Sequence, residues 1–229
     1  AVHAAGGLSL VGVDPISLGV LTTPPTYGAD IVCGDLQPLG IHMFYGGGQS
    51  GFMATTDEEK FVMEFPSRLF GLAPTSKPGE YGFGDVAYDR TSFGHHREHG
   101  KEYVGTQSAL WGITAGVYLA TMGPQGMVEV DELIMANAQY AAKKLAEIPG
   151  VKVNPFGGAF FKEFVVDFTG TGKTVEEINK ALLAKGIFGG KDLSKEFPNL
   201  GQSALYCVTE VHMKEDLDTL AAALAEVIK

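Results

Sequence analysis

Three histidines and two arginines lie close together between residues 90 and 99, and they form the densest group of side chains that could bind an ion. The histidines are His95, His96 and His99, and the arginines are Arg90 and Arg97. Residues at positions i and i+4 share one face of a helix, so His95 and His99 could approach the same metal ion. No acidic or cysteine side chain stands where it would obviously complete the coordination. The group therefore predicts contact with an anion or a partner surface, and no metal site.

The N-terminal part of the chain bears on cofactor chemistry mainly through what it lacks. Residues 1–59 contain no Lys and no Arg, and Gln37 and Pro38 follow an apolar run that reads as a strand. Neither residue carries a side-chain amine that could condense with an aldehyde. Asp14 follows another apolar run, where an aspartate before a proline typically forms a turn. The glycines at 46–48 could bring backbone amides to a phosphate, but a tight connection between strands is favoured, because the lysine and helix of a nucleotide-binding loop are absent.

The composition is that of a globular protein with a sizeable core. Of 229 residues, 45% are hydrophobic and 19% are charged, and the formal net charge is −10. This acidic balance argues against a nucleic-acid partner. No apolar run approaches the roughly 20 residues of a membrane helix, and no signal peptide is recognisable. Cys33 and Cys207 lie in apolar runs and are expected to be buried thiols of a cytoplasmic protein. The chain begins in what reads as the end of a helix, so a fragment or a processed chain is expected.

Apolar runs separated by glycine and proline predict short strands, and longer apolar or amphipathic stretches predict helices. Strands are expected at residues 8–13, 29–33, 41–44 and 51–55, and helices at 16–21, 57–65, 106–122 and 127–148. Residues 66–100 are expected to be irregular. The strands are short and do not alternate, which suits a sheet covered on both faces. The helix at 106–122 is small and apolar nearly all round, so it is expected to be buried.

From residue 151 onward the pattern is that of a small α+β domain. Strands are expected at 151–154, 160–168 and 205–211, and helices at 174–185 and 214–228. Thr174 and Glu177 form the sequence pattern of a capping box at the first of these helices. The sequence therefore predicts an α/β domain over residues 1–149 and a small α+β domain over residues 150–229, with helices on one face of the second sheet.

Several motifs together resemble one protein family. They occupy residues 11–19, 27–32, 37–40, 51–55, 186–190 and 208–211. On these residues the chain is similar to subunit 1, the alpha-type subunit, of the split glycine dehydrogenase (decarboxylating), the P-protein of the glycine cleavage system. The resemblance covers essentially the whole chain, but only the C-terminal half of the family's length. Gln37 and Pro38 are fairly specific for this subunit, because the catalytic subunit has a lysine there.

The resemblance implies the fold of type I pyridoxal-phosphate enzymes, with residues 1–149 as part of the large domain. It implies a complex that decarboxylates glycine and passes the aminomethyl group to a lipoyl carrier protein. Pyridoxal phosphate would belong to that complex, with its Schiff-base lysine on glycine dehydrogenase subunit 2 and no covalent attachment to this chain. Asp14 would take the cofactor-binding position of the aspartate that pairs with the pyridine nitrogen. No catalytic residue is expected in this chain itself.

One loop departs from the family. Where the family has a segment rich in Gln, Arg and His followed by Lys-Ala-Thr-Ser-Asn, residues 97–107 retain only Arg97, Glu98 and Thr106. In the family this loop lies toward the partner and the active site, which is the role implied here for Arg90, His95, His96, Arg97 and His99. The departure leaves open a non-catalytic scaffold or regulatory paralogue with another partner. A third alternative is a complete pyridoxal enzyme that uses a later lysine, such as Lys60 or Lys101.

Overall fold

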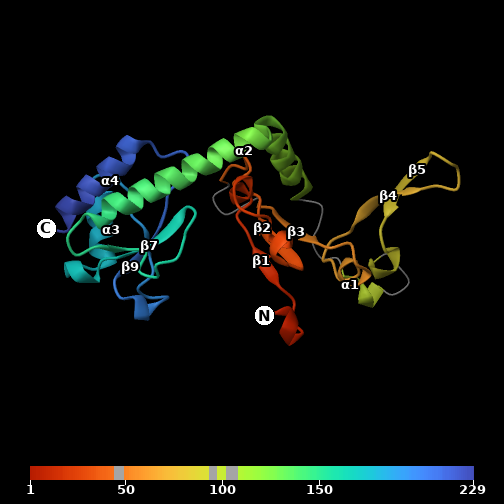
Figure 1. The fold of residues 1–229 in the computed structure, drawn as a ribbon, viewed down its shortest axis with the longest axis horizontal. Helices are drawn as coiled ribbons and strands as arrows, with labels where there is room; N and C mark the ends of the chain where they lie inside the picture. Colours follow the sequence, from red (N-terminus) through yellow and green to blue (C-terminus); the bar gives the residue numbers. More distant parts are fainter. Residues whose placement is uncertain (44–48, 93–96, 102–107) are drawn as a thin grey trace. The chain divides into compact units, whose positions relative to one another are not determined.

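The chain forms two compact units, Ala1–Gly123 (unit 1) and Pro124–Lys229 (unit 2). The computed structural model describes residues 1–43, 49–92, 97–101 and 108–229, and Figure 1 labels most of their helices and strands. In chain order these elements are β1 (Leu10–Gly12), β2 (Ile31–Asp35), β3 (Gly51–Thr55), α1 (Glu59–Val62), β4 (Phe70–Pro74), β5 (Tyr81–Asp85), α2 (Ala109–Ala146), β6 (Lys152–Val153), β7 (Glu163–Asp167), α3 (Val175–Leu183), β8 (Lys191–Asp192), β9 (Ser203–Cys207) and α4 (Lys214–Val227).

Unit 1 contains a three-stranded sheet in the order β1-β2-β3. β1 and β2 are parallel, and β3 runs antiparallel to β2. The predicted strands at 8–13, 29–33 and 51–55 are confirmed, with shorter or shifted ends. The prediction of a strand at 41–44 is wrong over 41–43, because the backbone there pairs with no other strand. β3 was expected to pair with that segment, and it pairs with β2 instead. The glycines at 46–48 lie outside the described residues.

The segment at 66–100 was expected to be irregular, and this prediction is wrong over residues 70–85. β4 and β5 form an antiparallel hairpin in which Leu72 lies opposite Phe83. Pro78 and Gly79 lie in the turn between the strands, where Gly79 has φ +81°, whereas Gly71, Pro74, Gly82 and Gly84 lie within the strands. An ion pair between Arg68 and Asp85 lies at the base of the hairpin. The predicted helix at 57–65 shrinks to the four residues of α1.

Helix α2 combines the two helices predicted at 106–122 and 127–148. Gly123 interrupts it with φ 63° and ψ 176°, a conformation that favours glycine, and Pro124 follows. The division of the chain into the two units falls at this break. The domain boundary between residues 149 and 150 was inferred from the change of pattern and stays a prediction. The expectation that the first half of α2 is buried is wrong, because Leu110, Ile113 and Val117 are each more than 60% exposed.

Unit 2 is a four-stranded sheet, in the order β6-β7-β9-β8, with helices over one face. Phe164 and Val166 of β7 pair with Tyr206 and Ala204 of β9, so these four side chains point to one face. They are buried in a single core with side chains from the second half of α2, from α3 and from α4. The small α+β arrangement predicted from the sequence is thus confirmed, and β8 is a strand that the pattern missed.

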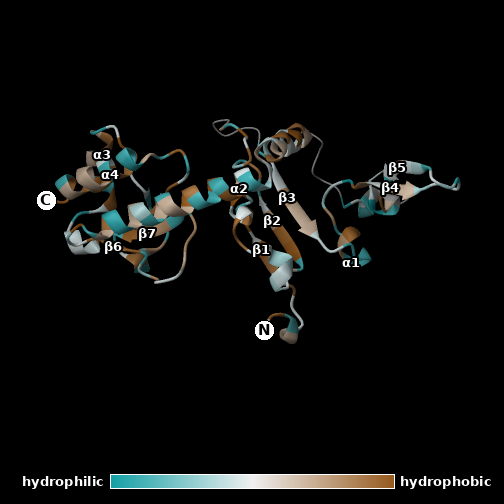
Figure 2. Cartoon of the chain, turned by 45° about the horizontal axis from the view of Figure 1, so that its top comes forward, coloured by the Kyte–Doolittle hydropathy of each residue, from teal (hydrophilic) through white to brown (hydrophobic). Residues whose placement is uncertain are grey.

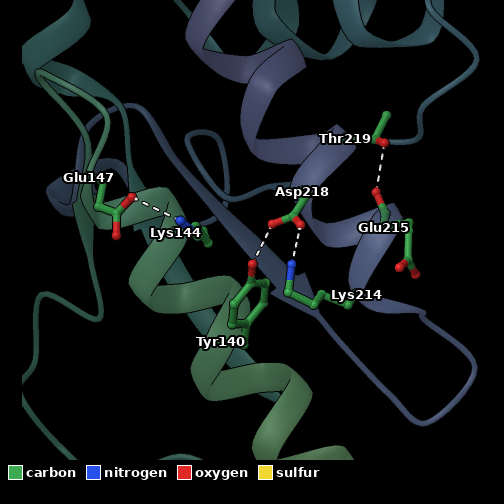
Figure 3. A network of polar contacts seen from close by, with 7 residues as sticks. All are labelled: Tyr140, Lys144, Glu147, Lys214, Glu215, Asp218 and Thr219. Atoms are coloured by element: carbon green, nitrogen blue, oxygen red, sulfur yellow. Dashed lines mark hydrogen bonds and ion pairs between the residues drawn. The ribbon is translucent and has the colours of Figure 1, made fainter.

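Polar contacts fix the helices of unit 2 to one another and at their ends. In Figure 3 the Tyr140 hydroxyl of α2 donates to Asp218 Oδ1 of α4 at 2.5 Å, and Lys214 Nζ donates to Asp218 Oδ2 at 2.6 Å. The hydrogen bond from Lys214, followed by that from Tyr140, lowers the pKa of the Asp218 carboxyl. The predicted capping box of α3 is confirmed, since Thr174 Oγ1 accepts from the Glu177 amide and Glu177 Oε2 accepts from the Thr174 amide.

The two cysteines do not form a disulfide with each other and lie in different surroundings. Cys33 is half-buried in β2, whereas Cys207 is exposed. The expectation that both are buried is wrong for Cys207, because alternation along β9 turns Tyr206 into the core and Cys207 away from it. None of the helices in the described part of the chain is both long enough and apolar enough to cross a membrane.

Candidate functional site

The candidate site lies at the carboxyl ends of β1 and β2. The two strands are parallel, with Leu10 opposite Ile31 and Gly12 opposite Cys33. Asp14, which follows β1, and Gln37, which follows β2, therefore come from the same edge of the sheet. Open sheets of this kind bind their ligands outside the carboxyl ends of parallel strands. Sequence reasoning singled out both residues separately, and the strand register places them at a common edge.

Asp14 is half-buried and organises the turn after β1. Its Oδ1 accepts from the Ile16 amide at 3.1 Å, and its carbonyl oxygen accepts from the Ser17 hydroxyl at 2.7 Å. These bonds start the short 3₁₀ turn at Ile16–Gly19. The carboxylate thus has the turn-forming role expected of an aspartate before proline. Its role toward a pyridine nitrogen stays a prediction.

Gln37 and Pro38 form a compact turn after β2. The Gln37 amide donates to Asp35 Oδ1 at 2.7 Å, and the Gln37 side-chain Nε2 donates to the Ile41 carbonyl at 3.0 Å. Leu39 and Ile41 anchor the turn, each with 3% of its surface exposed. The side-chain amide of Gln37 therefore serves the local fold, and this turn offers no primary amine at the end of β2.

Gly34 allows the site edge to close tightly. A Cβ added to Gly34 would lie 2.4 Å from the Val13 carbonyl oxygen and 2.6 Å from the Phe52 ring. Only glycine, which has no side chain, fits between the Val13 carbonyl at the end of β1 and the Phe52 ring of β3. Sequence reasoning did not single out Gly34. The signal was available, because an isolated glycine inside a strand pattern often marks a close backbone approach.

The N-terminal segment is tied to the start of β2 by Asp30. Its Oδ2 accepts from the Ser9 amide at 2.7 Å and lies 2.8 Å from His3 Nε2. The bond from the Ser9 amide, and next that from His3, lower the pKa of the Asp30 carboxyl. This aspartate is a structural link at the opposite end of β2 from Gln37.

The structure separates the members of the predicted partner loop. Arg90 is 3% exposed, and its guanidinium donates to the Phe65 and Ser67 carbonyls, both at 2.6 Å. Its described contacts thus hold the chain's own 65–67 segment. His99 is exposed, at the end of a 3₁₀ turn that begins at Arg97. His95 and His96 lie outside the described residues, and the role of this loop toward a partner stays a prediction.

The later lysines considered for a Schiff base lie away from the end of β2 in sequence and make surface ion pairs. Lys60 Nζ, in α1, is 2.8 Å from Glu58 Oε2, and Lys101 Nζ is 2.8 Å from Glu64 Oε2. Both side chains are more than 40% exposed. Within the ranges that the structure describes, no group of three His, Cys, Asp or Glu side chains is arranged to hold a metal ion.

Unit 2 contains a cavity of about 570 Å³ that two of the resemblance motifs line together. Residues 186–190 form one side, and Tyr206 and His212 contribute from the other. Burial raises the pKa of Tyr206 to about 12, which outweighs the opposing effect of the Gly190 amide. His212 Nδ1 accepts from the Thr209 amide at 3.0 Å, so the neutral imidazole carries its proton on Nε2. Sequence reasoning did not identify Tyr206 or His212.

Comparison with known proteins places these features in one family. The sequence model described as Glycine cleavage system P-protein matches residues 1–224. Over 99% of its length, the chain is 38% identical to a probable glycine dehydrogenase (decarboxylating) subunit 1 of Staphylothermus marinus and 37% identical to the one of Pyrococcus furiosus. It covers 48% and 49% of these two proteins, so it spans about half the length of the curated relatives it matches.

Solved structures confirm the predicted fold of type I pyridoxal-phosphate enzymes. The chain is similar to an inhibitor-bound crystal structure of glycine decarboxylase (P-protein) of the glycine cleavage system. The TM-score is 0.86 and the identity 36%, over 99% of this chain and 50% of that one. The cysteine desulfurase CsdA of Escherichia coli has a TM-score of 0.63 at 15% identity, over 99% of this chain and 53% of that chain. At this identity the second likeness shows the fold alone.

Proposed function

We propose, from the premise that this chain belongs to the glycine cleavage system P-protein family, that it is a part of a glycine dehydrogenase (decarboxylating) that lacks the Schiff-base lysine. The complex would decarboxylate glycine and transfer the aminomethyl group to a lipoyl carrier protein. The turn of Gln37 and Pro38 at the carboxyl end of β2 carries this proposal. It places an amide and an imino acid where a pyridoxal enzyme of this fold needs a primary amine.

Pyridoxal phosphate supplies an electron sink for bond cleavage at the α-carbon of an amino acid, and the protein binds and orients it. The described residues at the edge of β1 and β2 do not fit a covalently attached cofactor. Gln37 Nε2 is an amide nitrogen bonded to Ile41, and Lys60 and Lys101 are paired on the surface with glutamates. We therefore assign the lysine to glycine dehydrogenase subunit 2. The relatives named subunit 1 support a partner subunit of this kind.

The contribution of this chain is to shape one side of the composite site. Asp14 and Gln37 fix the two turns at the sheet edge through bonds to nearby backbone groups, and Gly34 leaves room for the Val13 carbonyl and the Phe52 ring beside β2. Asp14 is the residue that we propose to face the cofactor ring. The loop of Arg90, His95, His96, Arg97 and His99 would lie toward the partner. Such preorganised turns hold a site in place at little cost on binding.

Reconstitution tests the proposal. The chain alone, mixed with pyridoxal phosphate and borohydride, is expected to give no specific, stoichiometric adduct on any one lysine and no exchange of CO₂ with the glycine carboxyl group. Addition of a lysine-bearing subunit 2 and a lipoyl carrier is expected to restore both the adduct, on subunit 2, and glycine-dependent CO₂ exchange. A specific adduct on Lys60 or Lys101 of this chain would refute the assignment.

The same experiment separates the alternative of a scaffold or regulatory paralogue, which the departure of residues 97–107 from the family motivates. That alternative requires a complex with subunit 2, if one forms, to remain inactive with glycine. The 38% identity to a subunit 1 across 99% of the chain supports the catalytic partnership instead. We also propose a cytoplasmic location, which is consistent with Cys33 and Cys207 not forming a disulfide.

A further inference from the structure

The cavity of unit 2 takes no part in the proposed function, although two of the resemblance motifs line it. Every residue of its lining falls between positions 186 and 220, so the cavity belongs to unit 2 alone. Its volume of about 570 Å³ is typical of small-molecule sites. The cavity is therefore large enough for a small ligand, and its lining determines which kind.

One wall of the cavity is the loop of residues 186–190, which contacts within unit 2 hold in place. Asn179 Nδ2 of α3 donates to the Gly190 carbonyl at 2.8 Å. A Cβ added to Gly190 would lie 2.5 Å from the Tyr206 ring, and one added to Gly189 would collide with Asn179 Oδ1. The two glycines thus let the loop backbone lie directly against α3 and β9.

A second wall is the turn between β9 and α4, which His212 closes. Its Nδ1 accepts from the Thr209 amide at 3.0 Å. Asn137 Nδ2 of α2 donates to the carbonyls of Thr209 and His212, at 3.2 and 2.9 Å. These bonds fix the imidazole with its proton on Nε2, and Nε2 makes no hydrogen bond within the described ranges of the chain.

Tyr206 contributes a second hydrogen-bond donor. The residue is 5% exposed, and no group in the described part of the chain accepts its hydroxyl proton. Burial raises the pKa of this hydroxyl to about 12, so the proton stays in place at neutral pH. A buried donor without an acceptor costs free energy. An acceptor that enters from the cavity would remove this cost.

The rest of the lining is apolar or already bonded. Ile187, Leu217 and Leu220 give it an apolar surface, and the last two come from α4, which carries both hydrophobic and hydrophilic residues (Figure 2). Lys191 and Asp216 have opposite charges, so the lining has no net charge. Lys191, Asp216 and Thr219 bond to Glu196, the Met213 amide and the Glu215 carbonyl, respectively.

We infer that this cavity binds a small, largely apolar molecule with an uncharged hydrogen-bond acceptor, such as the carbonyl oxygen of an aromatic ketone or amide. The two groups without an acceptor, His212 Nε2 and the Tyr206 hydroxyl, are both donors, so the ligand supplies acceptors. An apolar lining without net charge favours an uncharged ligand over an ion. Because bonds within unit 2 already hold both walls, binding requires little further ordering. The inference goes beyond the proposed function and rests on unit 2 alone.

Acetophenone and benzylamine, each added to the full chain, test the inference. The two probes are similar in size, but acetophenone carries a carbonyl acceptor, whereas benzylamine is a cationic donor at neutral pH. Protein NMR is expected to show saturable shifts with acetophenone, confined to residues around the cavity, with the millimolar affinity typical of so small a probe. Benzylamine is expected to bind more weakly by a factor of about ten, because its charge loses hydration and meets two donors.

His212→Asn separates the donor from the fold of the turn. The asparagine Oδ1 can still accept from the Thr209 amide, but no N–H remains at the position of Nε2. We expect acetophenone to bind about 2- to 10-fold more weakly, the range for one hydrogen bond. Asp216→Asn is the matched control, because it removes a charge from the lining and keeps an acceptor for the Met213 amide. It should change the affinity less than about twofold.

Tyr206→Phe removes only the hydroxyl and is expected to weaken acetophenone binding by a similar factor. Exchange of the Thr209 amide at the wild-type rate verifies that the turn of His212→Asn is intact, and Tyr206→Phe decides the question if it is not. Unchanged affinity in the deciding variant would overturn the inference. So would shifts with acetophenone that do not saturate, benzylamine that binds as tightly, or an equal loss in Asp216→Asn. All these readouts measure binding to unit 2, so they do not depend on whether the complex cleaves glycine.

Discussion

A single methyl group added at Gly34 is expected to disrupt the edge of the sheet that carries the candidate site. Its Cβ would lie 2.4 Å from the Val13 carbonyl oxygen and 2.6 Å from the Phe52 ring. The ring can turn aside, but the carbonyl cannot easily move, because the Val13 amide is bonded to the Cys33 carbonyl at 2.9 Å. Overpacking of this kind costs about 1–3 kcal/mol. Gly12→Ala on the neighbouring strand meets nothing within 4 Å and is expected to be neutral or to stabilise by about 0.4–1 kcal/mol.

Amide hydrogen exchange of β2 in the full chain measures this difference. A cost of about 1–3 kcal/mol corresponds to exchange that is roughly 5- to 150-fold faster in Gly34→Ala. The β2 amides of Gly12→Ala should exchange at the wild-type rate or more slowly, and the amides of α3 in unit 2 should be unchanged in both variants. If the two variants exchange alike, the close approach of the Val13 carbonyl and the Phe52 ring to Gly34 is refuted.

Three further expectations test unit 2 and the N-terminal segment. Thr174→Ala should lower the free energy of unfolding of unit 2 in urea by about 1 kcal/mol. Thr174→Ser retains the capping hydroxyl and should lower it less, so equal losses in the two variants would contradict the capping role. Leu182→Ala, at a fully buried site, should cost about 3 kcal/mol, whereas Leu183→Ala, at a site 55% exposed, should cost less than about 0.5 kcal/mol. Asp30 should titrate by NMR below its ordinary 3.8, because the Ser9 amide stabilises the carboxylate. This stabilisation is present above the ordinary pKa and is lost as the pH falls through the lowered pKa, so Asp30→Asn should abolish the acid-dependent loss of Ser9 protection.

Sequence patterns predicted best those features that neighbouring residues determine. The capping box at Thr174 and helix α4 were predicted correctly, because their signals lie within one turn of the residues that they position. The parallel pairing of β1 with β2 was not predicted from local pattern, and it is this pairing that brings Asp14 and Gln37 to one edge. The identity of the two site residues was thus visible in the sequence, whereas their common location required the strand register.

The hairpin of β4 and β5 shows how turn residues can mislead when they are read alone. Prolines and glycines between residues 71 and 84 suggested an irregular segment. The large apolar residues nevertheless alternate along each strand, at positions 70 and 72 of β4 and at positions 81 and 83 of β5. Leu72 and Phe83 lie opposite each other and are exposed by 73% and 72%. Alternation marks a strand even where the apolar face has no cover within the chain. The alternation of apolar residues therefore indicates the strand conformation more reliably than the prolines and glycines indicate an irregular segment. The alternating side chains are not buried, however.

The failed expectation for the first half of α2 has the same physical basis. The composition of a segment reflects its surroundings in the folded protein. A helix without ionised side chains has the composition that is typical of buried helices. In the chain by itself Ile113 is nevertheless 64% exposed, while Ala138 on the second half of the same helix is fully buried. The discrepancy is confined to unit 1, where few large apolar side chains are fully buried. Composition alone therefore overestimated how far the other described residues of unit 1 cover this helix.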